Sequence, residues 1–116
     1  MPLNVLDYHY RSFTQQILPI LLKRNIGVIG MKSVGGGFGG RFLKIKSFEA
    51  QELIRYSMSL PVSVLVSGMD SLEVLESNLR IASNFVGMSE GEKSELLSRA
   101  KPFSKNGEFE SYKIRE

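Results

Sequence analysis

The chain has 116 residues, of which 42% are hydrophobic and 23% are charged, and its formal net charge is +3. This size and composition predict one globular domain, and the small charge, spread along the chain, does not indicate nucleic acid binding. The lack of cysteine excludes disulfides, thiolate metal sites and thiol nucleophiles. No apolar run approaches the length of a membrane span and no signal-peptide pattern is found, so we expect a cytoplasmic protein.

The first predicted unit is a short strand over residues 3–6 followed by an amphipathic helix. Ser12 and Gln15 have the spacing of a capping box at the start of this helix. The helix ends in the basic residues before Asn25, which suit its dipole. Pro19 lies inside it, so we expect a bend there.

The second predicted unit begins with a buried strand over residues 26–31, rich in β-branched side chains. The strand runs into Lys32–Val34 and then into Gly35–Gly40, in which five of six residues are glycine. A second helix follows, with Ser47 as its predicted N-cap and Pro61 as its end.

The third predicted unit is a strand over residues 62–66 and a long amphipathic helix. Asp70 and Glu73 have capping-box spacing at the start of that helix. Strands that alternate with helices predict parallel pairing and right-handed crossovers.

Ser89 and Glu92 cap a final short helix. Residues 101–116 are polar and aperiodic, which predicts an extended tail.

The glycine-rich loop contains a G-x-G-x-x-G pattern at Gly35, Gly37 and Gly40. The strict dinucleotide fingerprint also requires a helix at the last glycine and an acid at the end of the next strand. Here residues 41–46 intervene before the helix, and the next strand ends at Ser67 without a carboxylate. The fingerprint is therefore incomplete, and a phosphate-contacting loop and a plain connector both stay open.

The same loop has features of an RNA-binding segment, with Arg41, Lys44 and Lys46 beside Phe38 and Phe42 for base stacking. A single basic patch of this kind is more typical of a solvated surface loop, which is the favoured interpretation.

At two further positions, His9 and Asp70, an ordinary structural role is favoured over a functional one. His9, the only histidine, follows the first predicted strand, and a catalytic histidine needs both a partner and an orienting group. The helix start at Asp70 could bind an anion through its free N–H groups, although capping alone explains these residues.

Three segments, PLNVLD, ILPILLKRNIGVIGMKSVGGG and LIRYSMSLPVSVLVSGMDSLEVLESNLRIA, resemble the C-terminal part of aldo/keto reductases. The resemblance covers residues 1–90, and the tail GEFESYK is similar to that of bacterial relatives. It implies a partial (β/α)₈ TIM barrel, an α/β fold with three parallel strand–helix units over residues 1–100, plus the tail 101–116. It also implies NADP or NAD as cofactor in the reduction of carbonyl compounds.

The resemblance further implies which residues contact the cofactor, in the loops after the second and third predicted strands. These residues are Met31, Lys32, Ser33, Val34, Gly35, Gly68, Met69, Asp70, Ser71 and Asn78. The basic residue that NADPH users carry in the second segment is missing, because Gly68 and Asp70 stand there, so NADP and NAD both stay open. No residue matches the family's catalytic Asp, Tyr, Lys and His, and the chain alone is expected to be inactive.

Three parallel strands would leave two unpaired sheet edges and an uncovered inner face. We therefore expect the isolated chain to be poorly folded, to self-associate, or to be completed by another polypeptide, such as an N-terminal half-barrel. The alternative function is a non-catalytic interaction module that pairs through its open sheet edges.

Overall fold

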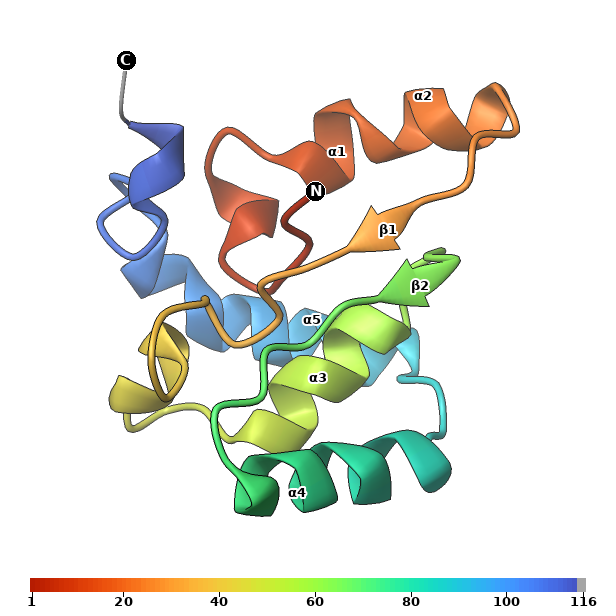
Figure 1. The fold of residues 1–116 in the computed structure, drawn as a ribbon. Helices are drawn as coiled ribbons and strands as arrows, with labels where there is room; N and C mark the ends of the chain where they lie inside the picture. The colour runs from red at the N-terminus through yellow and green to blue at the C-terminus, as the bar shows by residue number, and fades with distance from the viewer. Residues whose placement is uncertain (115–116) are drawn as a thin grey trace.

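The computed structural model describes residues 1–114, in which helices provide most of the ordered structure (Figure 1). The α-helices are α1 (Phe13–Gln16), α2 (Leu18–Lys23), α3 (Ala50–Met58), α4 (Leu72–Ser83) and α5 (Glu90–Ala100). The strands of these residues are β1 (Ile29–Gly30) and β2 (Val64–Leu65). Short 3₁₀ turns are η1 (Asp7–His9), η2 (Arg41–Lys44), η3 (Lys101–Phe103) and η4 (Ser111–Lys113).

The expected partial (β/α)₈ barrel with three strand–helix units is wrong. Within residues 1–114 the sheet has two strands, β1 and β2, which run parallel with Ile29 opposite Val64 and Gly30 opposite Leu65. Both strands are far shorter than predicted, because neither is flanked by a full-length neighbour. The molecule is a small, mainly helical domain around a two-residue parallel ladder.

The predicted first strand, residues 3–6, is reduced to one isolated parallel bridge between Pro2 and Met31. The chain turns away after that bridge, because the Asn4 side chain accepts hydrogen bonds from the N–H groups of Leu6 (3.0 Å) and Asp7 (2.9 Å). Asparagine side chains stabilise turns in this way and compete with strand pairing.

The two-stranded ladder leaves several of its apolar side chains exposed. Ile29, Val64 and Val66 are 54%, 53% and 52% exposed. Val66 directly follows β2, two residues after Val64, and its N–H still donates to the Gly30 carbonyl. Since Ile29 pairs with Val64, the three side chains share a face. One apolar face of the ladder is therefore open.

Several predicted helix starts and breaks are confirmed. The Ser12 side chain accepts a hydrogen bond from the Gln15 N–H at the start of α1, and Pro19 lies in the first turn of the separate helix α2. The expected bend is thus a break between two helices. Ser89 and Glu92 form the predicted capping box of α5.

The two other predicted caps are displaced. Helix α3 is capped by Glu49 and Glu52 in a reciprocal box rather than by Ser47. Helix α4 is capped by Ser71, whose hydroxyl accepts from the Val74 N–H, rather than by Asp70.

The core consists of two apolar clusters. The larger joins α3, α5, the segment after the glycine-rich loop and the chain start; its buried members are Val5, Leu6, Phe42, Ile45, Phe48, Leu53, Tyr56, Leu96 and Ala100. The smaller joins α2 to the chain start and to the residues before β1; its buried members are Leu3, Leu18 and Val28. Leu60 packs against both clusters. The radius of gyration is 13.6 Å.

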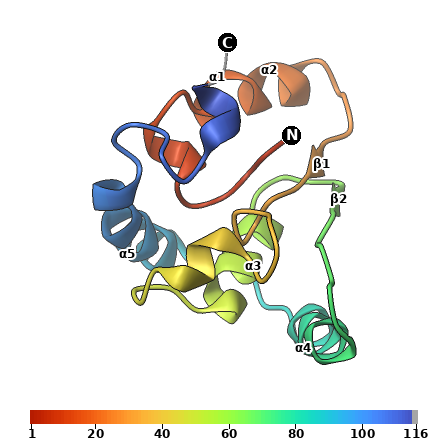
Figure 2. The same ribbon diagram turned by 60° about the vertical axis from the view of Figure 1, so that its left-hand side comes forward.

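The expected extended tail is folded in its described part, which includes η3 and η4 and lies beside the N-terminal segment (Figure 2). Lys113 and Glu110 are buried there, and the Lys113 ammonium lies 2.7 Å from the Asp7 carboxylate and 2.8 Å from that of Glu110. The ion pair between Lys113 and Asp7, which lie near opposite ends of the chain, anchors the tail. Residues 115 and 116 of the predicted tail lie outside the described residues.

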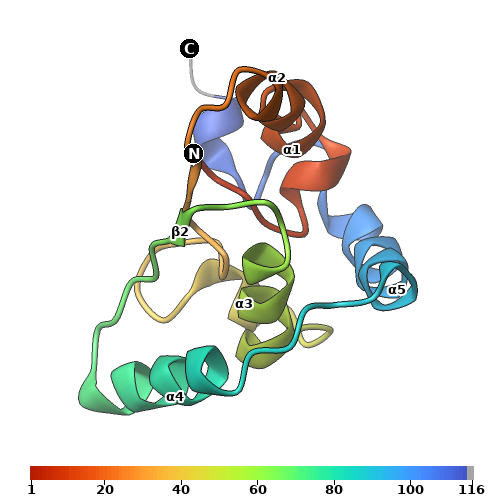
Figure 3. The same cartoon turned by 90° about the vertical axis from the view of Figure 1, so that its right-hand side faces the viewer.

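Helix α4 lies at the periphery, next to α3 and away from α1 and α2 (Figure 3). Although its sequence is amphipathic, the described chain buries none of the twelve residues of α4. Leu72 and Leu79 are 70% and 57% exposed. The space between α4 and the rest of the chain is where the candidate site lies.

Candidate functional site

A pocket of about 550 Å³ opens at the carboxyl ends of the two parallel strands. One rim is the loop after β1, the other is the connection from β2 to α4, and the floor includes Ala50 and Ile54 of α3. Parallel α/β folds place ligand sites at this end of their strands. The volume lies within the range of small-molecule and cofactor sites.

The pocket brings together most of the residues for which the sequence predicted cofactor contact. Eight of the ten line it, namely Met31, Lys32, Ser33, Val34, Gly68, Met69, Asp70 and Asn78. Gly35 and Ser71 do not line it. Gly35 packs against the buried Phe42 ring and Ser71 caps α4, so both have structural roles.

The glycine-rich loop presents bare backbone to this pocket. Gly35, Gly36 and Gly37 have φ angles of +86°, +67° and +74°, a left-handed conformation that glycine adopts without strain. Among residues 1–114, the N–H groups of Gly36, Gly37 and Phe38 have no protein acceptor. Successive free N–H groups of this kind form concavities that bind anions.

Lys32 is the one cationic residue among those that line the pocket. Its φ of +60° is left-handed, which is uncommon outside glycine and asparagine and concentrates at functional sites. A Cβ placed on Gly36 would lie 3.1 Å from the Lys32 Nζ, so the ammonium rests against the glycine loop. This geometry places a positive charge beside the free N–H groups.

Tyr112 supports that ammonium, because the Lys32 Nζ lies 5.2 Å from the centre of the Tyr112 ring. Burial and the hydrogen bond to Glu110 raise the pKa of Tyr112 above its ordinary value. The phenol therefore stays protonated and donates to the Glu110 Oε1 at 2.5 Å. The folded tail thus contributes to the position of Lys32.

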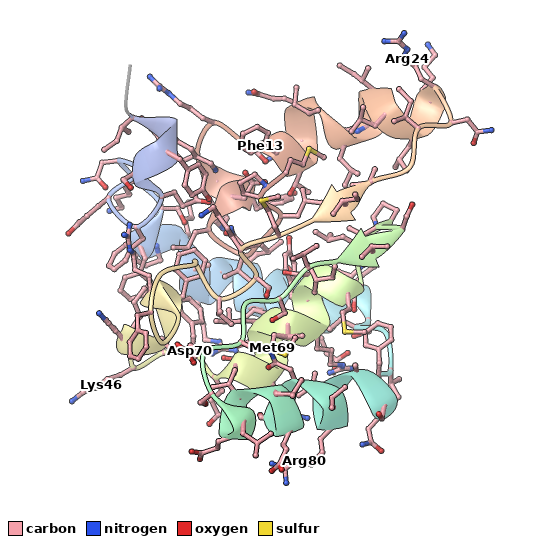
Figure 4. The ribbon with its side chains drawn as sticks, in the orientation of Figure 1. Phe13, Arg24, Lys46, Met69, Asp70 and Arg80 are labelled. Carbon is pink, nitrogen blue, oxygen red and sulfur yellow. The ribbon has the colours of Figure 1, made fainter. Side chains whose placement is uncertain are left out.

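The opposite rim is held by two polar contacts. The Asn78 side-chain amide donates to the Ser67 hydroxyl at 3.0 Å and ties α4 to the end of β2. The Gly39 N–H donates to the Asp70 Oδ2 at 2.9 Å and joins the loop to the start of α4. In Figure 4 the labelled Met69 and Asp70 lie in the connection from β2 to α4, on the side of the glycine-rich loop.

Sequence reasoning missed several apolar residues of the pocket wall. These are Leu43 of η2, Ala50 and Ile54 of α3, Val66 just after β2, and Val74 of α4. The incomplete burial of α4, which opens the pocket, has no local signal in the sequence.

His9 lies outside the pocket. Its Nε2 is 2.7 Å from the Leu97 carbonyl oxygen, which can only accept, so Nε2 carries a proton and the imidazole has a structural role. Residues 1–114 hold no group of three or more metal-ligating His, Cys, Asp or Glu side chains. Within the same residues, no helix is long and apolar enough to cross a bilayer.

The chain matches no protein-family model, no curated protein and no solved structure.

Proposed function

We propose that this chain binds the phosphate-bearing part of a nicotinamide dinucleotide, NADP or NAD, in the pocket at the carboxyl ends of β1 and β2. The main support for the proposal is that two segments far apart in the sequence line the same pocket. The resemblance to aldo/keto reductase segments points to residues 31–35, 68–71 and 78, and eight of these ten residues line the pocket.

The donor set of the pocket suits a phosphate. Lys32 supplies a positive charge, and the free N–H groups of Gly36, Gly37 and Phe38 lie in the same loop. A hydrogen bond to a charged group contributes about 1.5–3 kcal/mol, so this cluster would provide much of the affinity for an anion. The apolar wall of Leu43, Ile54 and Val74 would cover the less polar part of such a ligand.

The proposed role is binding without turnover. The family's catalytic Asp, Tyr, Lys and His have no counterpart in the matched segments. We expect the purified chain to leave NADPH unoxidised in the presence of an aldehyde. Steady oxidation under those conditions would contradict this part of the proposal.

Isothermal titration calorimetry with NADPH and NADH tests the binding site. Lys32→Met is expected to weaken NADPH binding about tenfold, since the loss of one charged contact costs about 1.4 kcal/mol. The matched control is Lys46→Met, which removes the same charge from an exposed side chain that does not line the pocket (Figure 4). Equal affinities for the two variants would contradict the proposed role of Lys32.

A second candidate function, self-association through β2, is favoured by the edge that this strand leaves unpaired in the described part of the chain. Within residues 1–114, β2 pairs with β1 on one side only. Residues 57–69 contain no charged side chain, whereas exposed edge strands usually carry charges that prevent pairing. Two copies could therefore pair through this edge without charge repulsion.

Sedimentation velocity over a range of concentrations tests this candidate. The wild-type chain is expected to form dimers, and Val64→Lys is expected to abolish them by charging the edge. Ile20→Lys is the control, because Ile20 is 52% exposed on α2, away from β2. A wild-type chain that stays monomeric at every concentration would rule out the second candidate.

A further inference from the structure

One hydrogen bond joins the glycine-rich loop to Asp70 across the candidate pocket. The Asp70 Oδ2 accepts a hydrogen bond from the Gly39 N–H at 2.9 Å, and both residues line the pocket. They belong to opposite rims, one after β1 and the other before α4. The carboxylate of Asp70 is also the one acidic group among the residues that line the pocket.

Asp70 is free to make this contact because another residue caps α4. The Ser71 hydroxyl accepts the Val74 N–H at 3.1 Å, so Ser71 takes the capping role that the sequence assigned to Asp70. The Asp70 carboxylate is therefore directed to a loop 31 residues earlier in the chain rather than to its own helix.

The tip of the loop has few other supports. Cβ atoms placed on Gly37 and Gly39 would meet nothing within 4 Å, and Phe38 between them is 87% exposed. Side-chain packing thus does little to hold the tip in place. The bond to Asp70 is the contact that joins it to the other rim of the pocket.

We infer that Asp70 is an internal competitor for the anion site of the glycine-rich loop. Its carboxylate holds the Gly39 N–H beside the free N–H groups of Gly36, Gly37 and Phe38, where a phosphate would bind. A carboxylate and a phosphate repel each other at close range, so the phosphate must displace Asp70 from the loop. This inference rests on the proposed binding of a dinucleotide phosphate in the same pocket. It predicts that the wild-type chain binds phosphate ligands less tightly than the same pocket would without the Asp70 carboxylate.

Calorimetric titration with inorganic pyrophosphate and with NADPH tests the inference. Asp70→Asn is expected to tighten binding of both about tenfold, which corresponds to the removal of about 1.4 kcal/mol of repulsion. The matched control, Glu73→Gln, removes the same charge from the first turn of α4 but does not line the pocket. It is expected to change affinity by less than about twofold, as for exposed charges generally.

The possible outcomes separate this inference from the proposed function. If the wild-type chain binds NADPH and Asp70→Asn binds it equally or less tightly, the competitor role is overturned while the proposed function stands. If neither variant binds NADPH or pyrophosphate, both are overturned. A measurement without ligand adds an independent check: in Asp70→Ala the Gly39 amide proton is expected to exchange with solvent faster than in the wild type. An unchanged exchange rate would show that Asp70 does not hold the Gly39 N–H in solution.

Discussion

Replacing Lys113 by methionine is expected to lower the free energy of unfolding by about 3–5 kcal/mol, the usual cost of removing one partner from a buried ion pair. The Lys113 ammonium lies 2.7 Å from the Asp7 Oδ1 and 2.8 Å from the Glu110 Oε2. These side chains are 1%, 0% and 2% exposed. Without the ammonium, two buried carboxylates face each other with no positive charge between them.

The surroundings of this cluster depend on the same ammonium. Lys113 Nζ also donates to the Tyr10 carbonyl oxygen at 2.7 Å, and Asp7 accepts the N–H groups of Phe13 and Thr14 at the start of α1. Loss of the ion pair should therefore release the tail and weaken the start of α1 together. In Figure 4 the labelled Phe13 lies in α1, and its ring centre is 5.7 Å from the Lys113 Nζ.

Urea unfolding followed by circular dichroism measures the effect. Lys105→Met is the matched control, because Lys105 is an exposed lysine in the same tail. Its effect should lie within about 0.5 kcal/mol of zero, as is usual for surface substitutions. If Lys113→Met were no more destabilising than Lys105→Met, the buried cluster would not hold the tail in solution.

The second large effect is expected at Gly35, where alanine should lower the free energy of unfolding by about 2–5 kcal/mol. The residue has a φ of +86°, and an added Cβ would lie 2.5 Å from the Cδ1 of Phe42. Phe42 is fully buried in the larger cluster, so its ring has little room to move. Left-handed strain and overpacking therefore add at this position.

Gly37→Ala separates these two causes. Gly37 has a similar φ of +74°, but a Cβ there would meet nothing within 4 Å. Only the conformational cost of about 1–2 kcal/mol should remain. Thermal or urea unfolding of the two variants gives the comparison. Equal losses of stability would show that contact with Phe42 contributes nothing to the requirement for glycine at position 35.

Local patterns predicted two of the four helix caps, because caps depend on residues a few positions apart. Ser89 and Glu92 form the full capping box that their spacing predicts, whereas of the box predicted for Ser12 and Gln15 only the bond from the Gln15 N–H to the Ser12 hydroxyl forms. The start of α4 shows the limit of this reasoning. Asp70 and Ser71 are both good caps, and the choice between them is decided by a bond from Asp70 to the distant Gly39.

The first strand and the tail were predicted wrongly for two different reasons. The apolar run at residues 3–6 fits a strand, yet the Asn4 side chain turns the chain after one bridge. The polar tail fits an extended segment, yet Lys113 finds a carboxylate 106 residues earlier in the sequence. The Asn4 turn is a contact between near neighbours in the sequence, whereas the pairing of Lys113 with Asp7 has no local signal.

Eight of the ten residues predicted to contact a cofactor line one pocket, although the barrel predicted to contain them is wrong. Lys32 and Asp70 follow two strands that do pair in parallel, and parallel strands bring their carboxyl ends to one edge. This relation holds although the two strands are short and the strand predicted at residues 3–6 is reduced to a single bridge. The position of Gly35 against Phe42, rather than in the pocket, required knowledge of the core.

The most direct test of the proposed dinucleotide site is a titration with NADPH followed by ¹⁵N–¹H NMR of the whole chain. The amide signals of residues 32–40 and 68–78 are expected to shift in a saturable way, while those of α2 and α5 stay in place. Contradiction would come from the absence of any shift. It would also come from shifts centred on Gln51, Arg55 and Arg80, which line a separate cavity between α3 and α4.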